Sequence, residues 1–257
     1  MSGQLRLEGK TALVTGAGQG IGKGCAQMFA RQGAHVLALD IDREALEATV
    51  SEVAGSAGAI EALGAVDLVD EAAVAAAFEA IAARHGALDI LVNAAAFATF
   101  AWIEDMAYAD WRRTLSGELD IVFLACQAAW PLLKASGKAS IINFASANAY
   151  HALEGSPALA HCAGKGGVLA MTRQLAMEGA PHGVRANTIS PGFILTAATT
   201  AHIARDPGFE AKVLAKNMVK RLGRPDDIAY LATYLASDEA AYVTATDFSC
   251  DGGATAW

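Results

Sequence analysis

Short apolar runs alternate with helix-length segments along most of this 257-residue chain. The expected strands cover residues 11–14, 35–39, 62–66, 90–92, 140–144 and 185–189, and the expected helices cover residues 22–32, 43–54, 71–84, 108–134 and 158–178. This alternation predicts an α/β fold with a parallel sheet, because right-handed crossovers between parallel strands place the helices on both faces. Ligands of such sheets bind beyond the carboxyl ends of the strands, so the residues that follow each strand are the candidates for function.

The composition is that of a folded protein with a large core. Hydrophobic residues make up 54% of the chain and charged residues 18%, and the formal net charge is −8. A surface that binds nucleic acid needs a basic face, so this charge argues against a nucleic-acid partner. The sequence has no internal repeat and no linker, which predicts a single domain over residues 1–257.

Several features predict a soluble cytoplasmic protein without a membrane partner. The first ten residues, MSGQLRLEGK, lack the apolar run of a signal peptide. We expect the most apolar long stretch at residues 72–83, which is too short to span a bilayer. The four cysteines are scattered without a C-x-x-C pair, as expected of reduced thiols. His151, His182 and His202 show no metal-ligand spacing with carboxylates, so no metal site is expected.

A glycine-rich segment, T-G-A-G-Q-G-I-G, follows the first expected strand at residues 15–22. Glycines there let the backbone approach a pyrophosphate, and the next helix offers its N-terminal amides to the same group. A lone glycine cluster also fits an ordinary tight turn, but Asp40 ends the second expected strand. A carboxylate at that place accepts hydrogen bonds from an adenosine ribose and repels a 2′-phosphate. Because Gln19 rather than a basic residue lies in the loop, NAD is the expected cofactor.

Several motifs together resemble those of the short-chain dehydrogenase/reductase family. They are T-G-x-x-x-G-I-G at 15–22, Asp40, L-V-N-A-A-A at 91–96, H-x-x-x-K at 161–165 where the family has Y-x-x-x-K, N-x-I-x-P-G-x-I at 187–194, and D-G-G at 251–253. The likeness runs from about residue 8 to residue 253. It implies a single-domain Rossmann fold with a doubly wound, seven-stranded parallel sheet, and subunits assembled as a homotetramer (or homodimer).

The resemblance also implies which residues bind the dinucleotide. By position, the pyrophosphate would lie at Gly16, Gln19, Gly20, Ile21 and Gly22, the adenosine ribose at Asp40, the adenine at Asp67 and Leu68, the nicotinamide carboxamide at Ile194 and Thr196, and the nicotinamide ribose at Lys165, with Asn93 as a further contact.

His161 stands where the family has its acid/base tyrosine, four residues before Lys165. Side chains with this spacing share one face of a helix. Imidazole titrates near neutral pH and transfers protons readily, and a nearby ammonium favours its neutral, basic form. We therefore expect His161 to be the base in alcohol oxidation. The alternative is that His161 only lines a pocket in an inactive protein.

Glu118 marks a second departure from the family pattern. It stands seven residues after Trp111, where the family has an asparagine that holds a water beside the lysine. A carboxylate there would pair with Lys165 and offset its effect on His161. The alternative is a local shift of the alignment that leaves Glu118 in solvent.

Ser146 matches the family serine that polarises the substrate carbonyl, but it lies farther from His161 than in the family pattern. The loop 147–159 is therefore expected to be longer than usual. Asn148 is the alternative hydrogen-bond donor, and Tyr150 is the next candidate for the base if His161 is not.

These residues predict an NAD-dependent oxidoreductase that interconverts a secondary alcohol and a ketone by hydride transfer, with Ser146, His161, Lys165 and Glu118 at the reacting atoms. A lyase or isomerase that uses the His161–Glu118 pair for proton transfer, and a nucleotide-binding protein without turnover, stay open as alternatives. The segment 199–218 resembles the family's variable substrate cover. Small residues along 158–176, with the helix 111–133, are expected to form a symmetric subunit interface.

Overall fold

The computed structural model describes residues 5–206 and 208–257, apart from the side chain of residue 202. Residues 1–4 of the N-terminal stretch and residue 207 of the segment 199–218 thus lie outside the described residues. Seven parallel strands form one sheet in the order β3-β2-β1-β4-β5-β6-β7. The strands are β1 (Thr11–Thr15), β2 (His35–Asp40), β3 (Ala59–Ala65), β4 (Ile90–Asn93), β5 (Ser140–Phe144), β6 (Arg185–Pro191) and β7 (Asp247–Cys250). The predicted doubly wound, single-domain Rossmann fold is confirmed.

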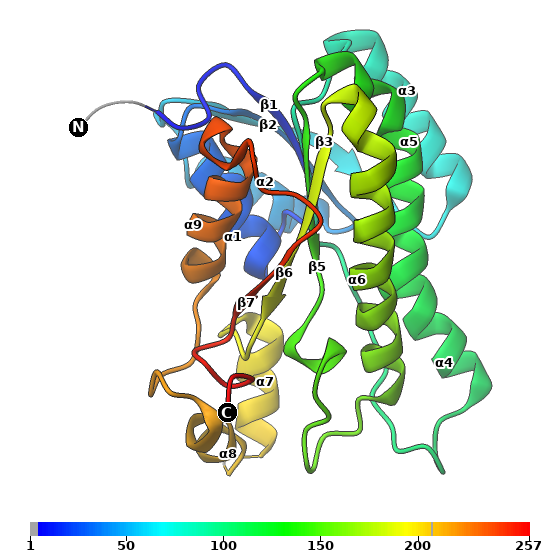
Figure 1. The fold of residues 1–257 in the computed structure, drawn as a ribbon, viewed down its shortest axis with the longest axis vertical. Coiled ribbons are helices and arrows are strands. Elements are labelled where there is room, and N and C mark those ends of the chain that lie inside the picture. Colours follow the sequence, from blue (N-terminus) through cyan, green and yellow to red (C-terminus); the bar gives the residue numbers. More distant parts are fainter. Residues whose placement is uncertain (1–4, 207) are drawn as a thin grey trace.

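Helices cover both faces of the sheet (Figure 1). One face carries α1 (Gly20–Arg31), α2 (Arg43–Ser51) and α9 (Pro225–Ala236), and the other carries α3 (Glu71–His85), α5 (Ile121–Ser136) and α6 (Leu159–Gly179). Successive residues of β1 show the division, since Val14 packs in the first apolar cluster and Leu13 in the second. The remaining α-helices are α4 (Tyr108–Leu115), α7 (Ala197–Arg205) and α8 (Phe209–Lys216), of which α7 and α8 lie beyond the carboxyl end of β6 (Figure 1).

The strand register fixes where the functional loops meet. Thr15, the last residue of β1, pairs with Asn93, the last residue of β4, and Asn93 pairs in turn with Asn143 near the end of β5. The strand order reverses between β1 and β4, so the loops after these two strands leave in opposite directions and open a crevice. This is the point of a doubly wound sheet at which ligands bind.

Some element boundaries differ from those expected. β3 begins at residue 59 rather than 62, because it is an edge strand whose exposed positions dilute the apolar pattern. α2 ends at residue 51 rather than 54. The helix expected over 108–134 extends to residue 136, but the five residues Ser116–Asp120 form a π-helical turn between α4 and α5. Such widened turns are frequent at functional sites.

Among the described residues, one helix, Tyr108–Ser136, is long and apolar enough to compare with a membrane span. Its most apolar window has a mean hydropathy of 1.2 and is 39% buried, and by length and composition alone it is able to cross a membrane. Ile121, Leu132 and Leu133 on this helix pack in the apolar cluster on one face of the sheet. This packing accounts for a large share of the apolar residues in α5.

Candidate active site

Two connected cavities lie at the carboxyl ends of the strands. The first, of about 520 Å³, is bordered by the glycine loop, by the end of β2 and by residues 94–97 after β4. The second, of about 640 Å³, is bordered by residues 144–148 after β5, by α6, by α8 and by residues 191–194 after β6. Ile21, Ala94, Ala96 and Thr196 line both cavities. A dinucleotide bound across the switch point would therefore reach from the first cavity into the second.

The glycine loop has the close backbone contacts that the sequence predicts. Gly16 and Gly20 have φ angles of +66° and +56°, a region that favours glycine. A Cβ atom at Gly16 would lie 2.7 Å from the Cα atom of Ala95, and one at Gly22 would lie 2.1 Å from the carbonyl oxygen of Gly16. The loop thus lies in close contact with the segment after β4. Because its glycines have no side chains, the floor of the first cavity stays open. This shape fits a pyrophosphate.

Asp40 closes the other side of the first cavity. Its Oδ2 accepts a hydrogen bond of 2.7 Å from the amide of Gly18, and its Oδ1 accepts one of 3.0 Å from the amide of Asp42. The carboxylate is thereby held at the rim in one orientation. Among the described residues that line this cavity the charged ones are Asp40 and Asp67, both acidic. A ribose diol has acceptors there, whereas a 2′-phosphate would meet negative charge.

The other residues expected around the pyrophosphate and adenine are also at this cavity. Gln19, Ile21, Asp67 and Leu68 line it, and Asp67 is fixed by the amide of Val69, which donates to its Oδ1 at 3.0 Å.

Asn93 is placed differently from the other residues expected to touch the dinucleotide. Its side chain is 4% exposed, and its Nδ2 donates to Oδ1 of Asn143 at 2.8 Å. Asn143 donates in turn to the hydroxyl of Thr172 on α6 at 2.9 Å. This buried chain of amides ties β4 to β5 and α6 beneath the cavities, and Asn93 lines neither cavity. The segment 94–96 is held by Thr15 instead, whose hydroxyl accepts hydrogen bonds from the amides of Ala94 and Ala95 at 3.1 Å and 3.2 Å.

Ile194 and Thr196 follow β6 on opposite sides of a tight turn. The amide of Thr196 donates to Thr199 Oγ1 at 2.6 Å, and that hydroxyl donates to the carbonyl of Ile194 at 2.7 Å. Ile194 lines the second cavity and Thr196 lines both, so the turn lies where the two cavities join.

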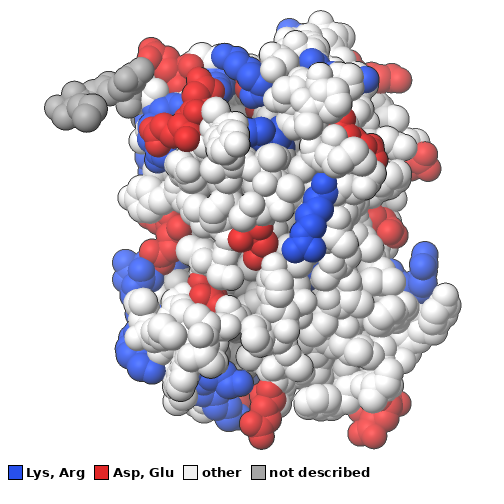
Figure 2. All heavy atoms as spheres, in the orientation of Figure 1, with Lys and Arg blue, Asp and Glu red and all other residues white. Residues whose placement is uncertain are grey.

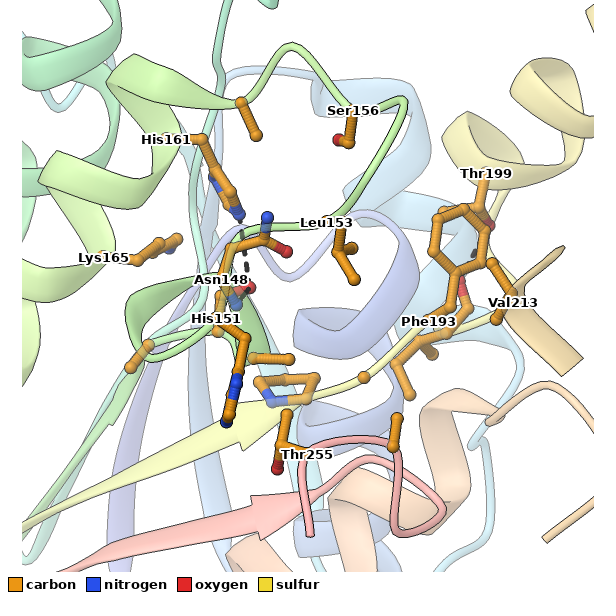
Figure 3. A pocket seen from close by; sticks show the side chains of 18 of the residues that line it. Asn148, His151, Leu153, Ser156, His161, Lys165, Phe193, Thr199, Val213 and Thr255 are labelled. Atoms are coloured by element: carbon orange, nitrogen blue, oxygen red, sulfur yellow. Dashed lines mark hydrogen bonds between the residues drawn. The ribbon is translucent and has the colours of Figure 1, made fainter. Parts of the chain in front are cut away.

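His161 lies at the wall of the second cavity (Figure 3) and connects a serine with a buried carboxylate. Its Nδ1 is 2.6 Å from Oε1 of Glu118, and its Nε2 is 3.3 Å from the Oγ of Ser146. An ionised carboxylate only accepts hydrogen bonds, so the proton of a neutral imidazole lies on Nδ1 and the Nε2 lone pair faces the serine hydroxyl. The structure thus brings together three of the four residues expected at the reacting atoms.

The π-helical turn aims Glu118 at the histidine. In this turn the Gly117 carbonyl accepts a hydrogen bond of 3.1 Å from the amide of Phe97, and a Cβ atom at Gly117 would lie 2.5 Å from the Phe97 ring. The side chain of Glu118 is 3% exposed and lies against Gly164, where an added Cβ would be 2.9 Å from Oε2. Glu118 is therefore not in solvent, and the alternative of a shifted alignment is wrong.

Lys165 completes the cluster from the next turn of α6. Its Nζ donates to the carbonyl of Phe144 at 3.1 Å, and the residue is 7% exposed. Burial lowers the pKa of Lys165, and the negative charge of Glu118 opposes that shift. Oε2 of Glu118 is buried without a hydrogen-bond partner among the described residues, and Lys165 is close enough to interact with its charge.

The longer loop after Ser146 places the two alternative residues differently. The amide of Asn148 donates to Ser146 Oγ at 3.1 Å, and Asn148 lines the second cavity. Tyr150 does not line it, and burial together with the neighbouring Asp247 raises the pKa of Tyr150 to about 12. A base near neutral pH needs the opposite shift, so these surroundings favour His161 over Tyr150 for that role.

Several cavity residues were not found by sequence reasoning. His151 and Leu153 reach the second cavity from the loop after β5, Val213 from α8, and Thr255 from the C-terminal tail (Figure 3). The segment 199–218 was expected to cover the substrate, but its individual residues were not singled out. Nothing in their local spacing marks them, because they meet only through the tertiary fold.

Comparison with known proteins identifies the family. A family model described as Enoyl-(Acyl carrier protein) reductase matches residues 16–255. D-threitol dehydrogenase of Mycolicibacterium smegmatis is 42% identical over 251 residues, which cover 97% of this chain and 94% of that protein. The chain belongs to the short-chain dehydrogenase/reductase family. Galactitol 2-dehydrogenase (L-tagatose-forming) of Cereibacter sphaeroides is 36% identical over 253 residues, which cover 98% of this chain and 97% of that protein.

Solved structures of the family share the whole fold. A short-chain type dehydrogenase/reductase from Mycobacterium marinum superposes with a TM-score of 0.90 at 31% identity, covering 98% of both chains. A structure from Beutenbergia cavernae with NADP bound at low occupancy gives a TM-score of 0.90 at 34% identity, covering 99% of this chain and 100% of that chain. The family is one of oxidoreductases that bind a nicotinamide dinucleotide, and the glycine loop and Asp40 described above fit such a group.

Replacing Gly164 with alanine should separate Glu118 from His161, because the added Cβ would lie 2.9 Å from Oε2 and 3.1 Å from Cβ of Glu118. Gly166→Ala on the same helix is the matched control, since no atom lies within 4 Å of a Cβ built there. Both changes raise helix propensity by about 1 kcal/mol, so the comparison isolates the contact. Proton NMR should show a far-downfield Nδ1–H signal in the native protein and in Gly166→Ala, and lose it in Gly164→Ala. An unchanged signal in Gly164→Ala would contradict this account.

Proposed function

We propose that this protein is an NAD-dependent dehydrogenase that interconverts a secondary alcohol and the corresponding ketone, with His161 as acid and base in place of tyrosine. The observation that supports it most strongly is the position of His161. Its Nε2 faces Ser146 at the wall of a cavity that joins the dinucleotide cleft, and its Nδ1 bonds to Glu118 at 2.6 Å. Because two relatives are named for polyols, D-threitol and galactitol are the first alcohols to test.

In the oxidative direction the substrate hydroxyl would lie between Ser146 and His161. The Ser146 hydroxyl holds the substrate oxygen, and Nε2 of His161 accepts its proton as the carbonyl forms. When bound, the oxidised nicotinamide accepts the hydride. The Nδ1–H of the new imidazolium stays hydrogen-bonded to Glu118, and the negative charge of Glu118 stabilises the imidazolium. Lys165, by its resemblance to the family lysine, holds the nicotinamide ribose.

The electrostatics of the first cavity favour NAD over NADP in this proposal. Asp40 and Asp67 are the charged side chains among its described lining residues, and they supply no cation for a 2′-phosphate. One structure that this chain resembles holds NADP, so the preference of this protein for NAD over NADP is to be measured directly. In this protein, Gln19 occupies the loop position at which a basic residue would serve NADP.

Asp40→Ala should narrow the preference for NADH over NADPH, because it removes the charge that repels the 2′-phosphate. The native protein should bind NADH more tightly than NADPH in calorimetric titrations. Asp67→Ala is the control, because it removes a charge from the same cavity on the adenine side. Tighter binding of NADPH by the native protein would refute the proposed cofactor.

His161→Ala should lower the turnover of alcohol oxidation roughly 10²–10⁴-fold, the usual contribution of a general base. In the native protein the rate should rise with pH, because only neutral imidazole accepts the proton. His151→Ala, which changes another histidine of the same cavity, should keep that pH profile. Formation of reduced nicotinamide, followed by absorbance, is the measurement. An unchanged profile in His161→Ala would exclude His161 as the base.

A double replacement tests whether His161 and Glu118 work as a unit. His161→Tyr alone would place a tyrosinate beside a buried carboxylate, so this variant should oxidise alcohols much more slowly than the native protein. His161→Tyr combined with Glu118→Asn restores the family's pair of residues. The rate of alcohol oxidation by this double variant should be at least about tenfold higher than that of either single variant. If the two changes act additively, the residues are not coupled.

We also propose a soluble, cytoplasmic homotetramer or homodimer. The four cysteines of the described chain are free thiols, as in proteins of reducing compartments. Part of the small-residue face of α6 is used within the chain, since Gly164 and Gly167 contact Glu118 and Leu119. The proposed assembly rests mainly on exposed apolar side chains of the layer formed by α4, α5 and α6. They are Tyr108, Phe123, Leu159 and Met177. Figure 2 shows broad uncharged surface over this layer.

The assembly should be larger than one chain, with α4, α5 and α6 at the interface. Phe123→Glu on α5, where the side chain is 49% exposed, should weaken association because it places a charge within an apolar contact. Tyr242→Glu, at a fully exposed position, is the control. Light scattering at micromolar concentration measures the mass, and a monomeric native protein would refute the proposal.

A further inference from the structure

Ser146, His161 and Glu118 stand in the order of a nucleophile, a base and an orienting carboxylate. The Ser146 hydroxyl is 3.3 Å from Nε2 of His161, and Nδ1 of the same ring is 2.6 Å from Glu118. Each side chain comes from a different element: the end of β5, the first turn of α6 and the π-helical turn. An imidazole oriented by a carboxylate removes the proton of a serine as it attacks a carbonyl carbon, and this chemistry needs no dinucleotide.

The surroundings of Ser146 accommodate an acyl group. Ser146 lines the cavity of about 640 Å³, whose wall includes the apolar side chains of Leu153, Phe193 and Val213 (Figure 3). The backbone amide of Asn148 donates to Ser146 Oγ, which fixes the oxygen while its own proton points to His161. The Asn148 side chain lines the same cavity (Figure 3), with its Nδ2 3.9 Å from Sγ of Cys162, and a side-chain amide is a group that stabilises an oxyanion.

We propose that this protein has a second activity, independent of the dinucleotide: it cleaves activated esters through an acyl group on Ser146. The serine oxygen attacks the ester carbonyl carbon while its proton moves to Nε2 of His161. The bond to the leaving alcohol then breaks, and the alcohol departs with that proton. A water molecule, deprotonated by Nε2, attacks the acyl carbon and releases the carboxylic acid, which restores Ser146. Glu118 stays ionised and stabilises the imidazolium in both halves, and nothing is oxidised or reduced.

The test uses the full chain without dinucleotide and two probes, p-nitrophenyl acetate and a fluorophosphonate. The ester should be hydrolysed, and mass spectrometry should find one phosphonyl group per chain, on Ser146. Ser146→Ala should abolish labelling, and Glu118→Gln should slow it roughly 10²-fold, because the imidazole loses its charged partner. Ser156→Ala is the matched control: this serine lines the same cavity and should leave labelling unchanged.

The outcomes separate this inference from the proposed dehydrogenase. Labelling of the native protein that Ser146→Ala loses, while that variant still binds NADH in calorimetry, supports the inference and excludes misfolding as the cause. A native protein that stays unlabelled, a label on another residue, or hydrolysis that persists in Ser146→Ala overturns it. A protein that oxidises alcohols but is never labelled overturns only this inference, and one that is labelled but oxidises no alcohol overturns only the proposed function.

Discussion

The buried carboxylate of Glu118 is the constraint on which the site depends. An ionised group that is 3% exposed is stable only beside opposite charge and hydrogen-bond donors. His161 supplies a donor at 2.6 Å, and Lys165 supplies the charge. The backbone of α6 must also come close, which Gly164 permits because it has no side chain. The π-helical turn places the carboxylate here. The position of its two oxygens therefore depends on the geometry of this turn, on the close packing at Gly164 and on the charge of Lys165.

In the proposed site, where His161 takes the place of the family tyrosine and Glu118 that of the asparagine, the two residues together keep the total charge of the family pattern. With tyrosine, asparagine and lysine, as in the family pattern, the cluster carries one positive charge when the base is protonated and none when it is not. With His161, Glu118 and Lys165 the same two totals arise, because the negative carboxylate cancels the extra positive charge of the imidazolium. Either replacement alone would shift both states by a full charge in a buried place. The two changes therefore make sense together and not singly.

Local spacing in the sequence predicted the sheet and the glycine loop of the dinucleotide cleft, and the resemblance to the family suggested the residues of the cluster. Apolar runs mark the strands, and the glycines at 16 and 22 mark close backbone contacts that no other residue permits. The π-helical turn was not predicted, since its apolar pattern continues that of the helices around it. The sequence suggested Lys165 as the main partner of the carboxylate and a His161–Glu118 pair only for the alternative lyase or isomerase, whereas in the structure Glu118 bonds to His161. Which residue a carboxylate meets is decided by crossing helices, and one sequence does not show that.

In the proposed reaction, one imidazole serves both directions of the alcohol–ketone interconversion. Neutral imidazole, with its lone pair on Nε2, is ready to accept the proton of an alcohol, and the imidazolium is ready to return one to a ketone. A tyrosine must be drawn far below its ordinary titration range to do the first task at neutral pH, whereas an imidazole titrates there already. The hydrogen bond from Nδ1 to Glu118 holds the ring in either protonation state, so that Nε2 stays toward Ser146.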